Sequence, residues 1–210
     1  MVYQCLLLSL SMNYLAHAYL SFGNEEILAG NLFSDYVKGK KQFDYTGLLH
    51  KGIRLHRMID AFTDAHPSTA AVKLFFKPAY GLYAGAFVDV VYDYFLANDT
   101  SIFNSNRELE LFAAHTYQML ENQFDRLPTN FQPVFLNMRK YNWLYNYQFT
   151  WGIQKSFAGL AYRAKYINET DTAFAIFEQN IHLIKPHYDH FFPLLKNYAA
   201  DTLSDLLKDD

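Results

Sequence analysis

The amino-acid sequence predicts an all-α protein with a single domain. Apolar residues recur at helical spacing along most of the chain, and no alternating strand pattern bounded by hairpin turns interrupts them. Of the 210 residues, 51% are hydrophobic and 18% are aromatic, whereas only nine are Gly and six are Pro. A chain of this length and composition can bury a substantial core without disulfides. We therefore expect one helical bundle over residues 12–200.

The first two expected helices are short and apolar. Residues 13–20 form one of them and carry His17, which in such surroundings is more often a hydrogen-bonded core residue than a metal ligand. Residues 25–38 form the other and place Asp35 among aromatic and apolar neighbours. A loop over residues 39–47 then leads to the third helix.

The third helix carries a strip of polar residues beside its apolar face. His56, Asp60 and Asp64 follow one another at intervals of four, and each interval turns the helix by only about 40°. Pro67 should end this helix. One imidazole and two carboxylates on one rigid edge could form half of a site for a hard or borderline divalent metal. A charged helix edge with intrahelical ion pairs is the alternative.

Residues 82–97 form a helix that is apolar on every side. The helix before it should be capped by Ser68 and broken at residues 78–81. Asp89 and Asp93 share one face of the 82–97 helix, where an ionised carboxylate is costly unless it is paired, hydrogen-bonded or bound to a metal. Two such carboxylates favour a shared cation. Salt bridges to Arg or Lys are the alternative.

The remaining sequence keeps the helical pattern, and we place helices at residues 106–124, 133–143, 147–166 and 172–195, with a break at Pro186. The aromatic run over residues 141–151 is interpreted as core packing. Residues 201–210 read as a polar tail that frays.

Residues 1–11 precede the patterned sequence, which begins at Met12. They are apolar, lack Lys and Arg, and are too short to span a membrane. We interpret them as an N-terminal extension or an over-called start, and we expect no membrane span. The lone Cys5 excludes an internal disulfide, so the cytoplasm is the expected location.

Positive charge is concentrated just before the polar strip. The net charge of −3 gives no reason to expect nucleic-acid binding. Between residues 38 and 57, however, Asp44 is the single acidic residue. The basic residues of this segment are Lys38, Lys40, Lys41, Lys51, Arg54 and Arg57. Such a segment would attract an acidic partner or a phosphate-bearing substrate. A solvated basic loop is the alternative.

Several common chemistries have no sequence signature here. The chain has no Gly-rich phosphate loop, dinucleotide fingerprint or Gly-x-Ser-x-Gly elbow. The candidates that remain are carboxylates and imidazoles of the first half, and the excess of oxygen ligands favours Mn²⁺, Mg²⁺ or Fe²⁺. Such a metal can polarise a phosphoryl oxygen and lower the pKa of a water, and Arg57 could neutralise charge on the phosphoryl group.

Four blocks in this order resemble the acyl carrier protein phosphodiesterase (holo-acyl-carrier-protein hydrolase) family. They are Met12-Asn13-x-Leu15-Ala16-His17, Gly30-Asn31-Leu-x-x-Asp35-Tyr-Val-Lys-Gly39, Gly52-Ile-x-x-His56-Arg57-x-Ile-Asp60-x-x-Thr-Asp64 and Asp89-Val-x-x-Asp93-x-Phe-Leu96. The resemblance extends from Met12 to about Leu195. It implies an HD-like helical fold, related to metal-dependent phosphohydrolases that usually take Mn²⁺. An adjacent His-Asp doublet is absent, so His56 and Asp60 would replace it.

The resemblance also implies a reaction and a partner. The reaction is hydrolysis of the phosphodiester that joins 4′-phosphopantetheine to a serine of holo-acyl carrier protein, which returns the apo carrier. Because acyl carrier proteins are small and acidic, the segment with Lys38, Lys40, Lys41, Lys51 and Arg54 is the expected partner-binding region.

The expected site combines metal ligands with residues that act on the substrate. The expected metal residues are His17, Asp35, His56, Asp60 and Asp93. The expected catalytic residues are Asp64, Arg57 and Asp89: Asp64 would orient a ligand or take a proton, Arg57 would hold phosphate, and Asp89 would complete or orient the site. Two alternatives stay open: an HD-like phosphohydrolase acting on a nucleotide or other small phosphodiester, and a non-catalytic carrier-protein-binding module.

Overall fold

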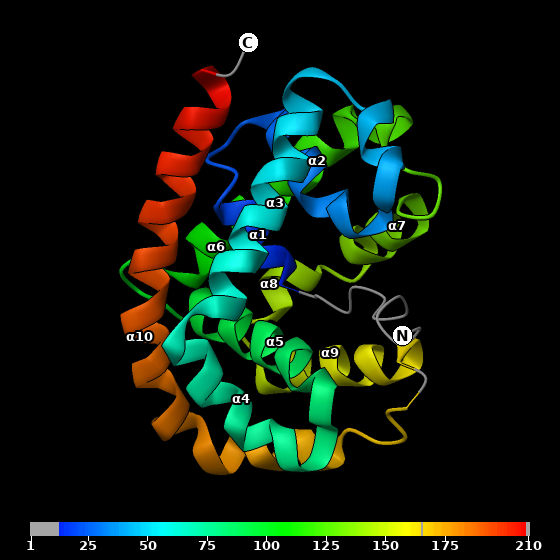
Figure 1. The fold of residues 1–210 in the computed structure, drawn as a ribbon. Coiled ribbons are helices and arrows are strands. Elements are labelled where there is room, and N and C mark those ends of the chain that lie inside the picture. Colours follow the sequence, from blue (N-terminus) through cyan, green and yellow to red (C-terminus); the bar gives the residue numbers. More distant parts are fainter. Residues whose placement is uncertain (1–12, 165, 209–210) are drawn as a thin grey trace, which may run out of the picture.

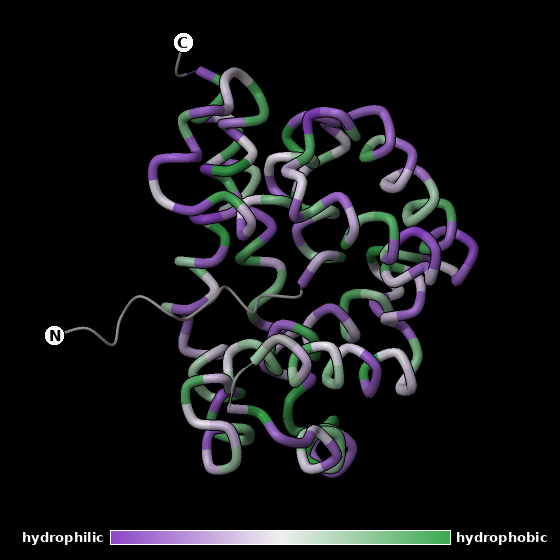
Figure 2. The backbone as a smooth tube through the Cα atoms, turned by 90° about the vertical axis from the view of Figure 1, so that its right-hand side faces the viewer, coloured by the Kyte–Doolittle hydropathy of each residue, from purple (hydrophilic) through white to green (hydrophobic). Residues whose placement is uncertain are grey.

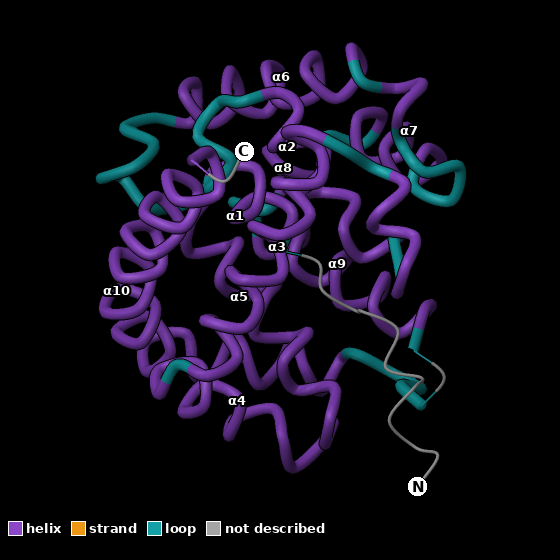
Figure 3. Tube along the Cα trace, turned by 45° about the horizontal axis from the view of Figure 1, so that its top comes forward, coloured by secondary structure: helices purple, strands orange, loops and turns teal. Residues whose placement is uncertain are grey.

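The computed structural model describes residues 13–164 and 166–208, and within them helices are the only regular secondary structure (Figure 3). The α-helices are α1 (Tyr14–Tyr19), α2 (Glu25–Phe33), α3 (Gly47–Ala65), α4 (Pro67–Tyr80), α5 (Ala84–Ala97), α6 (Asn106–Asn122), α7 (Gln132–Lys140), α8 (Trp143–Asn146), α9 (Thr150–Arg163) and α10 (Asp171–Lys208). Short 3-10 helices join some of them: η1 (Ser34–Tyr36), η2 (Gly39–Asp44), η3 (Gly81–Tyr83) and η4 (Phe124–Arg126). The all-α prediction is confirmed.

The helix α5 forms the centre of the bundle, with α1, α4, α9 and α10 packed around it (Figure 1). Its apolar residues are buried on nearly every side, as its sequence predicts. Along the other helices, hydrophilic and hydrophobic stretches alternate (Figure 2). This alternation is typical of amphipathic helices that share one core.

The helices α2 and α3 approach each other closely enough for their backbones to touch. A Cβ atom added to Gly30 would lie 2.2 Å from the carbonyl oxygen of Leu49, and one added to Gly52 would lie 2.4 Å from that of Ile27. Any side chain at either glycine would force the helices apart. This contact fixes the position of η1, which follows α2, relative to the middle of α3.

Several expected helix ends are wrong. The α4 helix begins at Pro67, where His66 and not Ser68 is the cap: Nδ1 of His66 accepts a hydrogen bond from the backbone N–H of Ser68. Pro78 lies inside α4, which ends at Tyr80 with Gly81 as its C-cap. Gly81 adopts a positive φ of 54°, which the glycine allows without strain.

The last helix is longer than its sequence suggests. The α10 helix runs through Pro186 without a break, because buried residues on both sides of the proline keep the helix packed on the bundle. The expected polar tail, 201–210, is instead helical as far as Lys208, with Leu203 and Leu206 buried. The expected extension, residues 1–11, lies outside the described residues.

One stretch, Pro67–Ala97, is long enough and apolar enough to cross a membrane, judged by its length and composition. The structure divides it at η3 into α4 and α5, each of 14 residues. A helix of that length extends about 21 Å, less than the roughly 30 Å of a bilayer core. Because α5 is also buried in the bundle, packing explains its apolar character.

Candidate metal centre

Four side chains of the expected site converge where α1, η1 and α3 meet. Nε2 of His56 lies 3.2 Å from Oδ1 of Asp35 and 3.2 Å from Oδ2 of Asp60. Nε2 of His17 lies 3.2 Å from the other oxygen, Oδ1, of Asp60. The ligand atoms of His17, His56 and Asp60 all lie within 4.8 Å of one another. The structure thus brings together two imidazoles and two carboxylates from three separate elements.

The two imidazoles are stacked, so their charges are coupled. The ring centroids of His17 and His56 are 4.1 Å apart, with 20° between the planes. Burial lowers the pKa of His56, but the carboxylates of Asp60 and Asp35 outweigh it and raise that pKa to about 10. Burial and the charge on His56 lower the pKa of His17. Without a metal, His56 therefore carries the positive charge of the group and His17 is neutral.

A buried amide fixes the orientation of His17. The Nδ2 group of Asn31 donates to the carbonyl oxygen of His17 and to Oγ of Ser21, each at 3.0 Å. Its Oδ1 atom must therefore face Nδ1 of His17, which lies 2.7 Å away and has to be the donor. In the neutral ring the proton is then on Nδ1, and Nε2 presents a lone pair to the carboxylate of Asp60.

This arrangement fits a divalent metal. A lone pair of His17 and a carboxylate oxygen of Asp60 repel each other at 3.2 Å unless a cation lies between them. Carboxylates raise the local negative charge, and Asn31 provides the outer hydrogen bond that usually orients a ligating histidine. His56 lacks such a bond, since its Nδ1 is buried with no hydrogen-bond partner among the described residues. Two nitrogen and two carboxylate donors suit Mn²⁺ or Fe²⁺.

The carboxylate of Asp93 lies outside this group. Both of its oxygens accept backbone hydrogen bonds, from the N–H groups of Leu15 at 3.0 Å and Ala16 at 2.9 Å. These are donors of the first turn of α1, which otherwise lack partners. The compensation that the sequence predicts from a cation is thus supplied by backbone N–H groups, which attach α1 to α5.

The three expected catalytic residues have different surroundings. Asp89 is half-buried, and burial together with the carboxylates of Asp60 and Asp64 raises its pKa well above the usual value. Asp64 is 74% exposed, and its carboxylate pairs with Nζ of Lys73 at 2.7 Å. Arg57 donates to the carbonyl oxygen of Val37 at 3.1 Å. Asp89 is therefore electrostatically coupled to the cluster of His17, Asp35, His56 and Asp60, which we call the metal group. Asp64 lies outside this cluster.

The basic segment lies partly before α3, at η2, and partly in the first turns of α3. Lys38, Lys40, Lys41 and Arg54 are exposed, as a partner-binding region requires. Lys51 differs from them, because it lies on the buried side of α3 and is only 8% exposed. An acidic partner would therefore reach four of the five expected residues.

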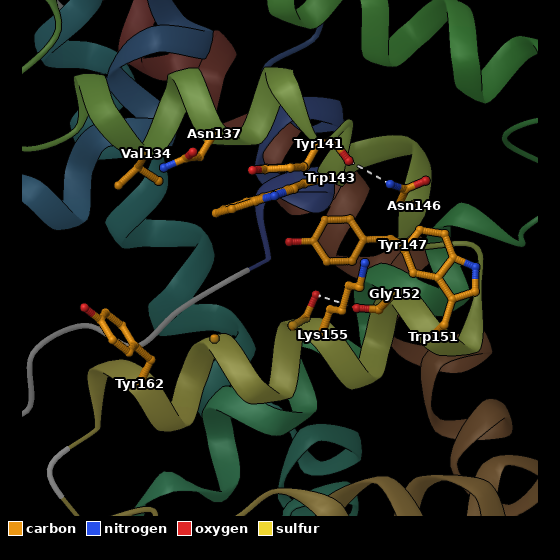
Figure 4. A pocket seen from close by; sticks show the side chains of 12 residues that line it. Val134, Asn137, Tyr141, Trp143, Asn146, Tyr147, Trp151, Gly152, Lys155 and Tyr162 are labelled. Atoms are coloured by element: carbon orange, nitrogen blue, oxygen red, sulfur yellow. Dashed lines mark hydrogen bonds between the residues drawn. The ribbon is translucent and has the colours of Figure 1, made fainter.

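The aromatic run that the sequence assigns to the core also lines a pocket of about 660 Å³ between α7 and α9. Figure 4 shows the rings of Trp143 and Tyr147 between these helices. The ring of Trp143 lies 6.2 Å from that of Tyr14 in α1, and the hydroxyl of Tyr14 bonds to that of Tyr36 at 2.9 Å. The pocket wall thus contacts α1, which carries His17, and through it the residue next to Asp35.

Sequence reasoning missed Asn31 and the pocket. Asn31 belongs to the Gly30-Asn31 block, but a neutral amide carries no charge signal that would mark it as part of a site. Its complete burial inside an apolar helix is the signal that could have identified it, because a buried amide needs specific partners.

Comparisons with known proteins identify the family of the chain. A family model described as acyl carrier protein phosphodiesterase matches residues 12–195. Proteins of that name from Serratia proteamaculans and Photorhabdus laumondii are 30% and 28% identical over 190 residues; the matches cover 90% of this chain and 98% and 96% of theirs. No solved structure matches the chain. The chain therefore belongs to the acyl carrier protein phosphodiesterase family.

Proposed function

We propose that this protein hydrolyses the phosphodiester that joins 4′-phosphopantetheine to a serine of holo-acyl carrier protein. The products are 4′-phosphopantetheine and the apo carrier. Family membership supports the reaction. The observation that carries the mechanism is the convergence of His17, Asp35, His56 and Asp60 at one point of the fold.

We also propose that these four side chains hold a divalent metal ion, with Mn²⁺ as the first candidate and Mg²⁺ or Fe²⁺ as the others. A bound ion of this kind supplies Lewis-acid polarisation of a phosphoryl oxygen and makes water more acidic. His56 and Asp60, one helical turn apart, take the place of the adjacent doublet of HD-type enzymes. The contacts of Asp93 favour a supporting role, in which it holds α1 and thereby His17 in place.

The residues around this group divide the remaining work. Arg57 follows His56 in α3, so its guanidinium can bind a phosphate held at the group. Asp89 can keep a proton because its pKa is raised, and a protonated carboxyl can donate to the serine oxygen as it leaves. Asp64 is proposed to exchange protons with solvent at the edge of the site.

The aromatic pocket is proposed to receive the prosthetic arm. An arm whose phosphate lies at the metal group must extend away from it, and Trp143 of the pocket wall packs against Tyr14 of α1. The exposed lysines before α3 favour an acidic carrier as partner. We place the reaction in the cytoplasm, in keeping with the single cysteine.

The test is incubation of the purified protein with holo carrier and Mn²⁺, followed by mass spectrometry of the carrier. The carrier should lose the mass of the phosphopantetheine group. No loss with Mn²⁺, Mg²⁺ or Fe²⁺ contradicts the proposal. Hydrolysis of a small phosphodiester without carrier hydrolysis would favour a small-molecule phosphohydrolase, and carrier binding without any hydrolysis would favour a non-catalytic binding module.

A further inference from the structure

An exposed phenylalanine lies among the basic residues before α3. Phe43 is 65% exposed on η2, a short helix that also carries Lys40 and Lys41. Leaving an aromatic ring of this size in water is unfavourable, and large exposed apolar side chains beside polar ones often mark binding sites. The lysines on the same short helix make this position distinct from an isolated exposed residue.

The outer side of α3 extends this surface. The ring of Phe43 lies 5.8 Å from that of His50, measured between centroids. His50, Arg54 and Met58 follow at intervals of four along α3, so each lies about 40° around the helix from the next. Arg54 is exposed and Met58 is 37% exposed. The apolar side chains of Phe43 and Met58 thus flank His50 and Arg54 in one row.

The row shares α3 with His56 and Asp60, and Arg57 joins this helix to η2. Arg57 donates to Oε1 of Gln42, which lies beside Phe43 in η2, and to the carbonyl oxygen of Val37. His56, which precedes Arg57 in α3, is buried, whereas Arg57 is half-buried. A protein that docks on the row would therefore contact the same helix, α3, that carries His56 and Asp60.

We propose that Phe43, Lys40, Lys41, Arg54 and Met58 form a docking surface for an acidic amphipathic helix of the carrier, with Phe43 as its apolar anchor. The inference rests on the proposed function and goes beyond it by naming the contact surface. Charge complementarity selects the occupant: between residues 38 and 58 the exposed charges are Lys38, Lys40, Lys41 and Arg54 against Asp44. A helix that carries carboxylates on both sides of an apolar residue matches this pattern.

Binding of the apo carrier tests this surface, because that carrier lacks the bond to be cleaved. Isothermal titration of the full chain with apo carrier gives the Kd for the unmodified protein, Phe43→Ala, and a variant with both Lys40→Glu and Lys41→Glu. We expect each change to weaken binding by roughly tenfold or more, as for an anchor residue and for a reversed charge pair. Binding by the unmodified protein should weaken as salt is raised.

Matched variants on the other side of the bundle serve as controls. Leu82→Ala removes an apolar side chain that is 85% exposed, and Lys77→Glu reverses an exposed charge on α4. Both should bind the apo carrier within twofold of the unmodified protein. Circular dichroism and hydrolysis of bis(4-nitrophenyl) phosphate should be unchanged in Phe43→Ala, because Phe43 does not touch the metal group.

The outcomes separate this inference from the proposed function. If the protein cleaves holo carrier but Phe43→Ala and the lysine variant bind apo carrier normally, the docking surface is wrong and the function stands. If the unmodified protein neither binds nor cleaves a carrier, both are wrong. Binding to vesicles of anionic lipid that these variants abolish, with carrier binding unaffected, would assign the surface to a membrane and overturn the inference.

Discussion

Nδ1 of His17 lies 2.7 Å from Oδ1 of Asn31, and this contact decides which nitrogen of His17 faces Asp60. The amide of Asn31 is held by its own two donated hydrogen bonds, so it cannot rotate to suit the ring. The histidine must therefore adapt to the amide, with a proton on Nδ1 and a lone pair on Nε2. An uncharged residue thus orients His17, which we propose as a metal ligand.

Replacing Asn31 should weaken metal binding. In Asn31→Leu the branched shape of the side chain is kept, but Nδ1 of His17 loses its acceptor and the ring can adopt the other tautomer. We expect Mn²⁺ affinity to fall by about 10–100-fold, the usual effect of removing an outer-shell partner. Nitrogen-15 spectra of the metal-free protein should show Nδ1 of His17 protonated in the unmodified chain and a mixture of tautomers in the variant.

Thr116→Val is the matched control for Asn31→Leu. Thr116 is fully buried and its hydroxyl has no hydrogen-bond partner among the described residues. Its removal should leave the His17 spectrum and the Mn²⁺ affinity unchanged. An unmodified protein with the proton of neutral His17 on Nε2 would contradict the tautomer assignment.

Asp93→Ala should lower the free energy of unfolding of the metal-free protein more than it lowers Mn²⁺ affinity. The change leaves the N–H groups of Leu15 and Ala16 without their acceptor, and each buried donor left unpaired costs about 1–3 kcal/mol. Urea unfolding of the metal-free protein measures this loss. If Asp93 were a ligand instead, metal-free stability would change little and Mn²⁺ affinity would fall steeply.

Two carboxylates on α3 should respond differently to the same substitution. Asp60→Asn removes a carboxylate that faces both histidines, and we expect Mn²⁺ binding to be lost in a titration. Asp64→Asn removes only an exposed ion pair with Lys73, which contributes about 0–1 kcal/mol, so Mn²⁺ affinity should stay within twofold. Equal losses of affinity in both variants would show that Asp64 also reaches the metal.

The metal-free protein should lose stability at alkaline pH. The pKa of His56 is raised to about 10 in the folded state, above the usual 6.5 of an unfolded chain. Its contribution to stability is therefore complete below pH 6.5 and declines as the pH rises through about 10. Urea unfolding from pH 6.5 to 10 should show this decline, and His56→Gln should flatten it. A stability that is constant over this range would contradict a charged His56.

The sequence was sufficient for the fold class and for the position of His56 and Asp60 on α3. Helical periodicity places His56 and Asp60 on the edge of the apolar face of α3, where the structure has them. The same periodicity wrongly places Asp64 on this edge. Two steps of about 40° turn Asp64 roughly 80° away from His56, and its side chain points to solvent. A strip at intervals of four stays on one face for only about two turns.

Other features depend on contacts that the linear sequence does not contain. The sequence correctly predicts that the buried carboxylate of Asp93 needs partners. Its partners are backbone N–H groups of α1, which every residue type except proline provides. Pro186 was expected to break α10, yet tertiary packing on both sides outweighs one missing hydrogen bond. The sequence also could not show that Lys51 faces the buried side of α3.

The central claim is that His17, Asp35, His56 and Asp60 hold one divalent metal ion. Anomalous diffraction at the manganese edge, from crystals of the protein grown with Mn²⁺, tests it most directly. We expect one strong peak within bonding distance of Nε2 of His17, Nε2 of His56 and the carboxylates of Asp35 and Asp60. A map with no peak among these side chains, and with His56 hydrogen-bonded to both carboxylates as in the metal-free protein, would contradict the account.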